Sequence, residues 1–210
     1  MDLQPILESL LRKVESRPVQ DVVVSQESLT DFASRMAQRG YIPSEQTLMA
    51  VEKYLQGYGL WLTGGVGTGK TAFFRCLPLV HPPRIFPMIS TLGKSVDELR
   101  DWLHDNADNE IVLDDIGSEP VFNSYGSKFE ILPWMLEARM ESRARTHVTS
   151  NLTAKMVLDR YGARVIDRFA EYFYRVDFTG KSKRFSRPRV ILGKIAVCAV
   201  PRVSGGKVMG

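Results

Sequence analysis

The sequence predicts an α/β fold built on a parallel sheet, and three features of the chain lead to it. An apolar run at residues 60–62 breaks into a glycine-rich turn and then into a segment with helical spacing. A second apolar run, 111–113, ends in the two carboxylates Asp114 and Asp115. Short strand-like runs alternate with amphipathic helical segments through the middle of the chain, which is the pattern of strands joined by helical crossovers.

The composition indicates one main domain with a small appendage. A chain of 210 residues with 44% hydrophobic content can bury one sizeable core. Its two cysteines, Cys76 and Cys198, lie far apart and have neither metal-ligand nor disulfide spacing, which is typical of a reducing compartment. The first residues lack the pattern of a signal peptide, and no apolar stretch approaches the length of a membrane span. We therefore expect a soluble cytoplasmic protein with no membrane partner.

The charge is unevenly distributed along the chain. Eight of the 28 basic residues and none of the 24 acidic ones follow Asp177. A body of net charge −4 is thus followed by a tail of +8. Such a tail indicates a polyanionic partner, although solvated basic tails without a specific role are also common.

Residues 64–71 match the pattern G-x-x-x-x-G-K-[ST], with a strand expected before them and a helix after them. Glycines in such a turn let backbone N–H groups point inward, where they and the start of the next helix can hold phosphate groups. Lys70 is placed to reach the β- and γ-phosphates, and the Thr71 hydroxyl to hold Mg²⁺. The predicted nucleotide contacts are Gly64, Gly65, Val66, Gly67, Thr68, Gly69, Lys70, Thr71 and Ala72.

The polar residues that end two other strands predict the metal-binding and catalytic half of the same site. Asp114 would hold Mg²⁺ through water, and Asp115 would orient or deprotonate the attacking water. Because a buried carboxylate needs a partner or a cation, paired acids at the end of an apolar strand favour this role over packing. Asn151 follows the strand expected at 146–149 and would hydrogen-bond the γ-phosphate or the water, with turn formation as the alternative.

Two arginines, Arg164 and Arg168, are spaced i, i+4 and so share one face of a short helix. They either form a solvated face with the neighbouring Asp167 and Glu171, or supply the charge that one subunit inserts into its neighbour's nucleotide site.

Three helical segments are expected before the glycine-rich turn, at residues 3–15, at 26–39 and in a segment capped by Ser44. Gly40 is expected to end the second of them. They either dock on the core or, in the case of the first, form a module that binds a partner. We accordingly divide the chain into a short helical N-terminal region at 1–40, a core at 41–180 and a basic C-terminal tail at 181–210.

Proline and aromatic positions give further expectations for the core. A strand at 84–90 contains Pro87 and should therefore lie at a sheet edge. Residues 119–127 are interpreted as a loop, followed by a helix that passes through Phe129 and is kinked at Pro133.

Four stretches in this order resemble the bacterial DnaC/DnaI/IstB group of AAA+ ATPases, which includes replicative helicase loaders and transposition helpers. They are residues 64–71, residues 112–119 (VLDDIGSE), residues 149–153 (TSNLT) and residues 161–169 (YGARVIDRF). The resemblance covers residues 45 to 185. It implies a P-loop NTPase with a five-stranded parallel sheet in the order 5-1-4-3-2, helices on both faces, and a helical lid that is truncated or absent.

The same resemblance implies roles for particular residues and partners. Asn151 would be the sensor of the γ-phosphate and Arg168 the arginine finger acting in trans, with Arg164 as the alternative finger. The cofactors would be ATP and Mg²⁺. The chain would form a homo-oligomeric ring or spiral whose active sites are shared between subunits, bind single-stranded DNA in the central channel, and grip a hexameric replicative helicase through the N-terminal region.

The leading hypothesis is therefore an ATPase that loads or remodels a replicative helicase on single-stranded DNA. The first alternative is an IstB-type transposition helper that assembles on duplex DNA. The second is an ATP-sensing adaptor that hydrolyses little, which the intact Asp114 and Asp115 pair argues against.

Overall fold

The computed structural model describes residues 26–79, 81–124, 127–141 and 144–180. Its helices are α2 (Gln26–Gln38), α3 (Glu45–Leu55), α4 (Lys70–Cys76), α5 (Val96–Asp105), α6 (Ile131–Met140), α7 (Ala154–Tyr161) and α8 (Ala163–Tyr172), with a 3-10 turn η1 (Met88–Thr91). Its strands are β1 (Gly59–Gly64), β2 (Arg84–Pro87), β3 (Ile111–Ile116), β4 (Phe122–Ser124), β5 (Ser127–Phe129), β6 (Thr146–Ser150) and β7 (Phe173–Phe178). The predicted helix at 3–15 and the basic tail at 181–210 lie outside the described residues.

The central sheet has five parallel strands in the order β2-β3-β6-β1-β7. When its strands are numbered by themselves in chain order and read from β7, this is the predicted order 5-1-4-3-2. β2 lies at one edge, as its proline predicted. The predicted extent of 84–90 was wrong, because the strand ends at Pro87 and residues 88–90 belong to the turn η1. Each parallel neighbour ends at the same side of the sheet, so the segments that follow β1, β3 and β6 converge there.

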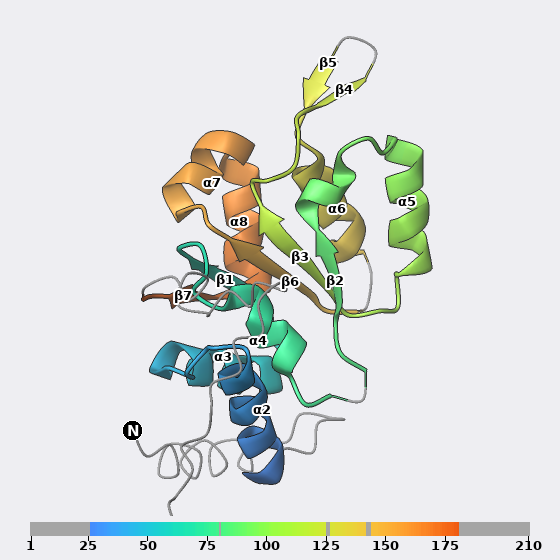
Figure 1. The fold of residues 1–210 in the computed structure, drawn as a ribbon. Coiled ribbons are helices and arrows are strands. Elements are labelled where there is room, and N and C mark those ends of the chain that lie inside the picture. The colour runs from blue at the N-terminus through green and yellow to red at the C-terminus, as the bar shows by residue number, and fades with distance from the viewer. Residues whose placement is uncertain (1–25, 80, 125–126, 142–143, 181–210) are drawn as a thin grey trace, which may run out of the picture.

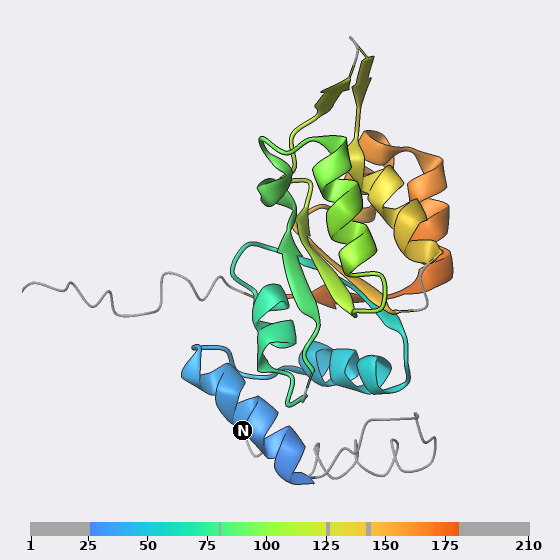
Figure 2. The ribbon, with the colours of Figure 1, turned by 90° about the vertical axis from the view of Figure 1, so that its right-hand side faces the viewer.

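Helices cover both faces of the sheet, and each face has its own hydrophobic cluster (Figures 1 and 2). In β1, Leu60 and Leu62 face the cluster made with α2, α3 and α4, whereas Trp61 faces the cluster made with α5 to α8. This alternation follows from the two-residue period of a strand. Both faces are buried, which explains the continuous apolar runs of β1 and β3.

Helix ends follow the capping residues of the sequence. The Ser44 hydroxyl accepts a hydrogen bond from the Thr47 N–H at 3.3 Å, and Ser95 forms a capping box with Glu98. The C-terminal end of α2 is followed by Gly40, which adopts φ 80°. The Tyr41 N–H then donates to the Met36 carbonyl at 2.9 Å. The chain therefore turns sharply at Gly40 and enters the region beside α4.

The helix α2 packs on the core. Leu29, Phe32 and Met36 are buried in the same cluster as Phe73 of α4, and the rings of Phe32 and Phe73 meet edge to face at 5.7 Å. The described part of the predicted 1–40 region thus docks on the sheet through α4. No helix among the described residues is long and apolar enough to cross a membrane.

The predictions for the segment after β3 were wrong in two respects. Residues 122–129, expected as loop and helix, form a β4–β5 hairpin that projects from the end of the sheet (Figure 1), with Phe122 paired to Phe129. The next helix, α6, starts only at Ile131, so Pro133 lies in its first turn and not in its interior. Because N–H groups in the first turn have no intrahelical acceptor, a proline there removes no hydrogen bond and has no reason to kink the helix.

A buried polar group joins the starts of three strands. His147 of β6 accepts a hydrogen bond from the Leu60 N–H at its Nδ1, 3.0 Å away, so its Nε2 carries the proton and donates to Glu110 at 2.5 Å. The ring is fully buried and stacks on Tyr54, 5.4 Å between centroids. Burial lowers the pKa of His147, because the imidazolium would lose its hydration, while Glu110 opposes that shift.

This histidine should make stability depend on pH in the acidic range. Below its ordinary pKa of about 6.5 the unfolded chain binds a proton that the folded chain does not, so the free energy of unfolding should fall as pH drops from 7.5 to 5.5. Urea unfolding at several pH values should show a shallower slope for His147→Gln. The control is His104→Gln, which replaces a histidine whose side chain is 88% exposed. Equal slopes in wild type and His147→Gln would contradict this account.

Candidate nucleotide-binding site

The glycine-rich turn between β1 and α4 has the backbone that its sequence predicted. Gly64, Gly67 and Gly69 have φ of 138°, 78° and 108°, which side-chain-bearing residues rarely adopt. Gly64 is also required for space, because a Cβ there would lie 2.1 Å from the carbonyl oxygen of Phe178. The last strand therefore fixes the entry of the turn.

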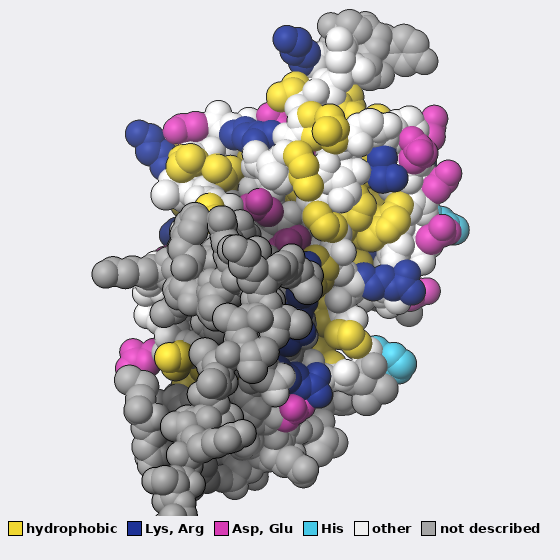
Figure 3. All heavy atoms as spheres, viewed as in Figure 1, with side chains coloured by type: hydrophobic (Ala, Val, Ile, Leu, Met, Phe, Trp, Pro, Cys, Tyr) yellow, Lys and Arg dark blue, Asp and Glu magenta, His cyan; other side chains and the backbone are white. Residues whose placement is uncertain are grey.

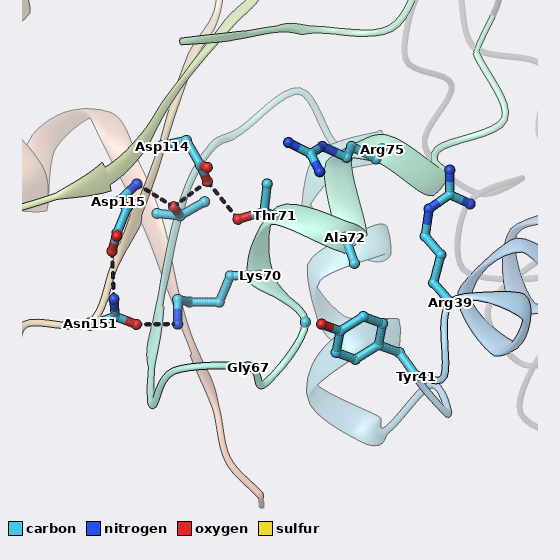
Figure 4. A pocket seen from close by; sticks show the side chains of 12 residues that line it. Arg39, Tyr41, Gly67, Lys70, Thr71, Ala72, Arg75, Asp114, Asp115 and Asn151 are labelled. Atoms are coloured by element: carbon cyan, nitrogen blue, oxygen red, sulfur yellow. Dashed lines mark hydrogen bonds between the residues drawn. The ribbon is translucent and has the colours of Figure 1, made fainter. Parts of the chain in front are cut away.

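The turn encloses a pocket of about 470 Å³ together with residues from four other segments (Figure 4). Its lining residues are Arg39, Tyr41, Gly67, Gly69, Lys70, Thr71, Ala72, Arg75, Asp114, Asp115, Thr149 and Asn151. Of the residues predicted to contact nucleotide, Gly64, Gly65, Val66 and Thr68 belong to the turn but not to this lining. Val66 points outward and is 52% exposed.

Lys70 lies at the centre of the turn. Its ammonium donates to the carbonyls of Gly64 and Gly65 at 2.7 and 2.8 Å and to the side-chain oxygen of Asn151 at 2.8 Å. These bonds hold a buried cation between the turn and the end of β6. The three bonds can occupy all three N–H donors of the ammonium, so a phosphate oxygen would have to replace one of these acceptors.

Asp114 meets two hydroxyl groups. The hydroxyls of Thr71 and Thr149 both donate to its Oδ1 at 2.7 Å, and its side chain is largely buried. Thr71 and Asp114 thus bring two hard oxygen donors together, which suits Mg²⁺. The described residues contain no group of three His, Cys, Asp or Glu side chains able to hold a metal ion, so most ligands of a magnesium ion here would have to be water and phosphate.

Asp115 occupies an irregular position in β3. Its φ is 61°, making it the one non-glycine residue with positive φ among the residues described, and the pairing of β3 with β6 shifts register between Leu113 and Ile116. A bulge of this kind re-aims a side chain, and here it brings the Asp115 carboxylate to the amide nitrogen of Asn151 at 2.5 Å. The backbone strain is concentrated at the residue predicted to act on water.

Thr149 is a site residue that the sequence did not predict. Its hydroxyl accepts the N–H of Asp115 at 2.8 Å while donating to Asp114. It is the residue that fixes both acids to β6. The sequence signal was its place at the end of the expected strand, two residues before Asn151.

Arg39, Tyr41 and Arg75 were also missed. The Tyr41 ring lies against Gly69, whose added Cβ would be 3.0 Å from it. Arg75 could have been found from the sequence, because it lies four residues after Thr71 and so on the same face of α4. Arg39 and Tyr41 come from a distant segment, and only the docking of α2 brings them to the pocket.

The loop that follows Asp115 is tied to α7 through Glu119. This carboxylate is buried and accepts hydrogen bonds from the Gly117 N–H at 2.8 Å and from the Tyr161 hydroxyl. Burial, aided by Glu119, raises the pKa of Tyr161. Arg160 donates to the carbonyls of Gly117 and Glu119 and to the carboxylate of Glu130, 3.0 Å away. The two legs of the β4–β5 hairpin are thereby fastened to α7.

The predicted finger residues lie away from this pocket, on α8. Arg164 pairs with Glu137 of α6 at 2.7 Å, and Arg168 with Glu171 at 3.2 Å. Both line a smaller cavity of about 290 Å³ between α6 and α8. They do not reach the nucleotide pocket of their own chain.

Comparisons with known proteins gave similarity in structure only. No protein-family model matches the chain, and no curated protein does. Among solved structures, the crystal structure of DnaI is 19% identical, with 82% of this chain and 93% of that chain covered at a TM-score of 0.47. AMPPCP-bound DnaA from Aquifex aeolicus is 18% identical over 70% of this chain at a TM-score of 0.47, and the match spans about half (51%) of that protein.

Proposed function

We propose that this chain is an AAA+ ATPase that binds Mg·ATP in the pocket beside Lys70 and uses hydrolysis to load or remodel a replicative helicase on single-stranded DNA. The observation that supports it most directly is the meeting of Lys70, Thr71, Asp114, Asp115 and Asn151, from the ends of two strands and from the turn that opens α4, around one cavity. The chemistry of this set matches phosphoryl transfer to water.

Each residue has a part that its contacts support. Lys70 would exchange its bonds to the turn carbonyls for phosphate oxygens, and the Thr71 hydroxyl and Asp114 would hold Mg²⁺, which neutralises phosphate charge when bound. Asp115 would orient the attacking water and take its proton, while Asn151, between Asp115 and Lys70, would fix the water relative to the γ-phosphate.

Binding and hydrolysis should separate in two variants. Lys70→Ala should abolish ATP binding, because it removes the central cation of the pocket. Asp115→Asn should retain binding and lose turnover, and asparagine is chosen because it tolerates the positive φ at this position better than alanine. Calorimetric titration with ATP and a phosphate-release assay on both variants decide the matter. If both variants lost binding equally, Asp115 would be a structural or metal ligand that supports binding, and not the base that takes a proton from water.

The arginine finger is proposed to act between subunits of a homo-oligomer. Arg168 and Arg164 are both on the outer surface of α8, with their side chains 37% and 75% exposed, so each is accessible to a neighbouring copy. Arg168 is the leading assignment, and Arg164 is the alternative.

Arg168→Ala should leave ATP affinity nearly intact and lower turnover by on the order of 10³, as expected for a residue acting on charge in the transition state. Mixing it with Lys70→Ala should restore activity at the hybrid interfaces, where an intact pocket meets an intact arginine. Steady-state ATPase assays of each variant and of the mixture measure this. Recovery with Arg164→Ala but not with Arg168→Ala in such mixtures would move the finger to Arg164.

Single-stranded DNA is proposed to contact the end of the sheet that carries η1 and the hairpin. These segments follow the carboxyl ends of β2 and β3, and they carry the exposed Lys94 and Lys128. The outer face of α5 is a poor candidate, because acidic side chains gather over it (Figure 3). Its exposed acids are Asp97, Glu98, Asp101 and Asp105.

Lys94→Gln and Lys128→Gln should each reduce the salt dependence of single-strand binding, by about 0.7 in the log–log slope per lost phosphate contact. Lys53→Gln on α3 is the matched control, and fluorescence anisotropy with ATP present gives the slopes.

In the same buffer, the ATP-bound chain should co-elute with the hexameric replicative helicase of its host, and Lys70→Ala should not. Tighter binding to duplex DNA without helicase association would favour the transposition helper. ATP binding without turnover or DNA binding would favour the adaptor.

A further inference from the structure

Two arginines line the nucleotide pocket on the side of Thr71 that faces away from the Lys70 ammonium (Figure 4). We propose that Arg39 and Arg75 form a second phosphate-binding element, which grips the phosphate chain of the bound nucleotide opposite Lys70. This inference rests on the proposed function, because it requires a nucleotide in the same pocket. It adds to that function two cations from the nucleotide's own subunit.

Arg75 is directed to the phosphates by the geometry of α4. It follows Thr71 by four residues, and helical side chains lean toward the N-terminus, so its guanidinium extends back over Thr71 (Figure 4). The side chain is exposed, and no hydrogen bond or ion pair joins it to another residue of the described chain. The side chain is therefore available to a ligand.

Arg39 reaches the pocket from the segment after α2, whereas Arg75 belongs to α4. Arg39 follows α2, and the turn after it is fixed by the positive φ of Gly40 and by the bond from the Tyr41 N–H to Met36. Its guanidinium donates a long hydrogen bond, 3.4 Å, to the Arg35 carbonyl, which is a weak contact for a charged donor. Because α2 is anchored by Phe32 on Phe73, the core itself holds Arg39 beside α4.

The side chains that line the pocket carry more positive than negative charge, so the pocket favours an anionic ligand. Lys70, Arg39 and Arg75 face Asp114 and Asp115, and the described residues show no carboxylate paired with either arginine. Asp114 accepts hydrogen bonds from two hydroxyl groups, and Asp115 accepts one from the Asn151 amide. Two guanidinium groups without an acid between them repel each other, and their planar donor forks match phosphate oxygens. A polyphosphate relieves the repulsion, whereas a neutral ligand does not.

A phosphate contact at Arg39 would also affect how α2 is held on the core. A phosphate held by Arg39 links α4 to the end of α2, and α2 follows directly on residues 1–25. Nucleotide binding would then stabilise α2 on the core. The segment before α2 would thus be attached to a helix whose docking on the core the nucleotide strengthens.

Calorimetric titration with Mg·ATP and with inorganic tripolyphosphate tests the assignment. Arg39→Gln and Arg75→Gln should each weaken both ligands by about tenfold, because each loses a charge-assisted contact to phosphate. Arg35→Gln is the matched control: it lies one turn earlier on α2, pairs with Asp31 at 2.6 Å and does not line the pocket. Both pocket arginines are exposed, so their replacement should leave thermal unfolding unchanged. Arg39→Lys and Arg75→Lys should recover part of the affinity.

Hydrogen exchange supplies a readout that a purely structural role would not move. ATP should slow exchange of the α2 amides in wild type and in Arg35→Gln, and should fail to do so in Arg39→Gln. Unchanged affinity in both pocket variants would overturn the proposal. Weaker ATP binding with unchanged tripolyphosphate binding would also overturn it, by assigning the arginines to the nucleoside. Full ATP affinity in Lys70→Ala would instead refute the nucleotide site itself.

Discussion

The Thr149 hydroxyl is the interaction on which the arrangement of the site depends. It accepts the N–H of Asp115 and donates to Asp114, so one side chain of β6 sets both acids of β3. The ladder between these strands is broken at that point, because the bulge turns Asp115 to a positive φ. A hydrogen bond from a neighbouring strand is what makes such a strained residue tolerable, and the strain aims its carboxylate at Asn151.

The α2 helix belongs to the site as much as to the N-terminal region. Its apolar stripe buries Leu29, Phe32 and Met36 against α4, the helix that starts at the glycine-rich turn. The turn that ends α2 then places Tyr41 against Gly69 and Arg39 along the pocket. The energy for this placement is hydrophobic burial far from any ligand. The residues that follow α2 therefore line the pocket because of packing in the hydrophobic core.

A second polar connection runs from the loop that follows Asp115 to the helix that carries Arg164 and Arg168. Glu119 and Arg160 join the loop after Asp115 to α7, and only Gly162 separates α7 from α8. Because Glu119 is buried and ionisable, it requires the partners that surround it, which makes this contact costly to break. Movement at the end of β3 would thus be passed to the helix that carries Arg164 and Arg168.

The sequence by itself determined the parts whose physics is local. The glycines and Lys70 of residues 64–71 set the turn, and Ser44 and Ser95 set helix starts. The apolar run before Asp114 sets a buried strand with a polar end. Parallel pairing then places the strand ends on one side of the sheet. The tertiary structure alone decided what distant segments bring: Arg39 and Tyr41 through the docking of α2, Thr149 through strand pairing, and the Glu119–Arg160 contact. The β4–β5 hairpin was missed because a strand of three residues is too short to show an alternating hydrophobic pattern. The kink expected at Pro133 was wrong because the effect of a proline depends on where the helix begins.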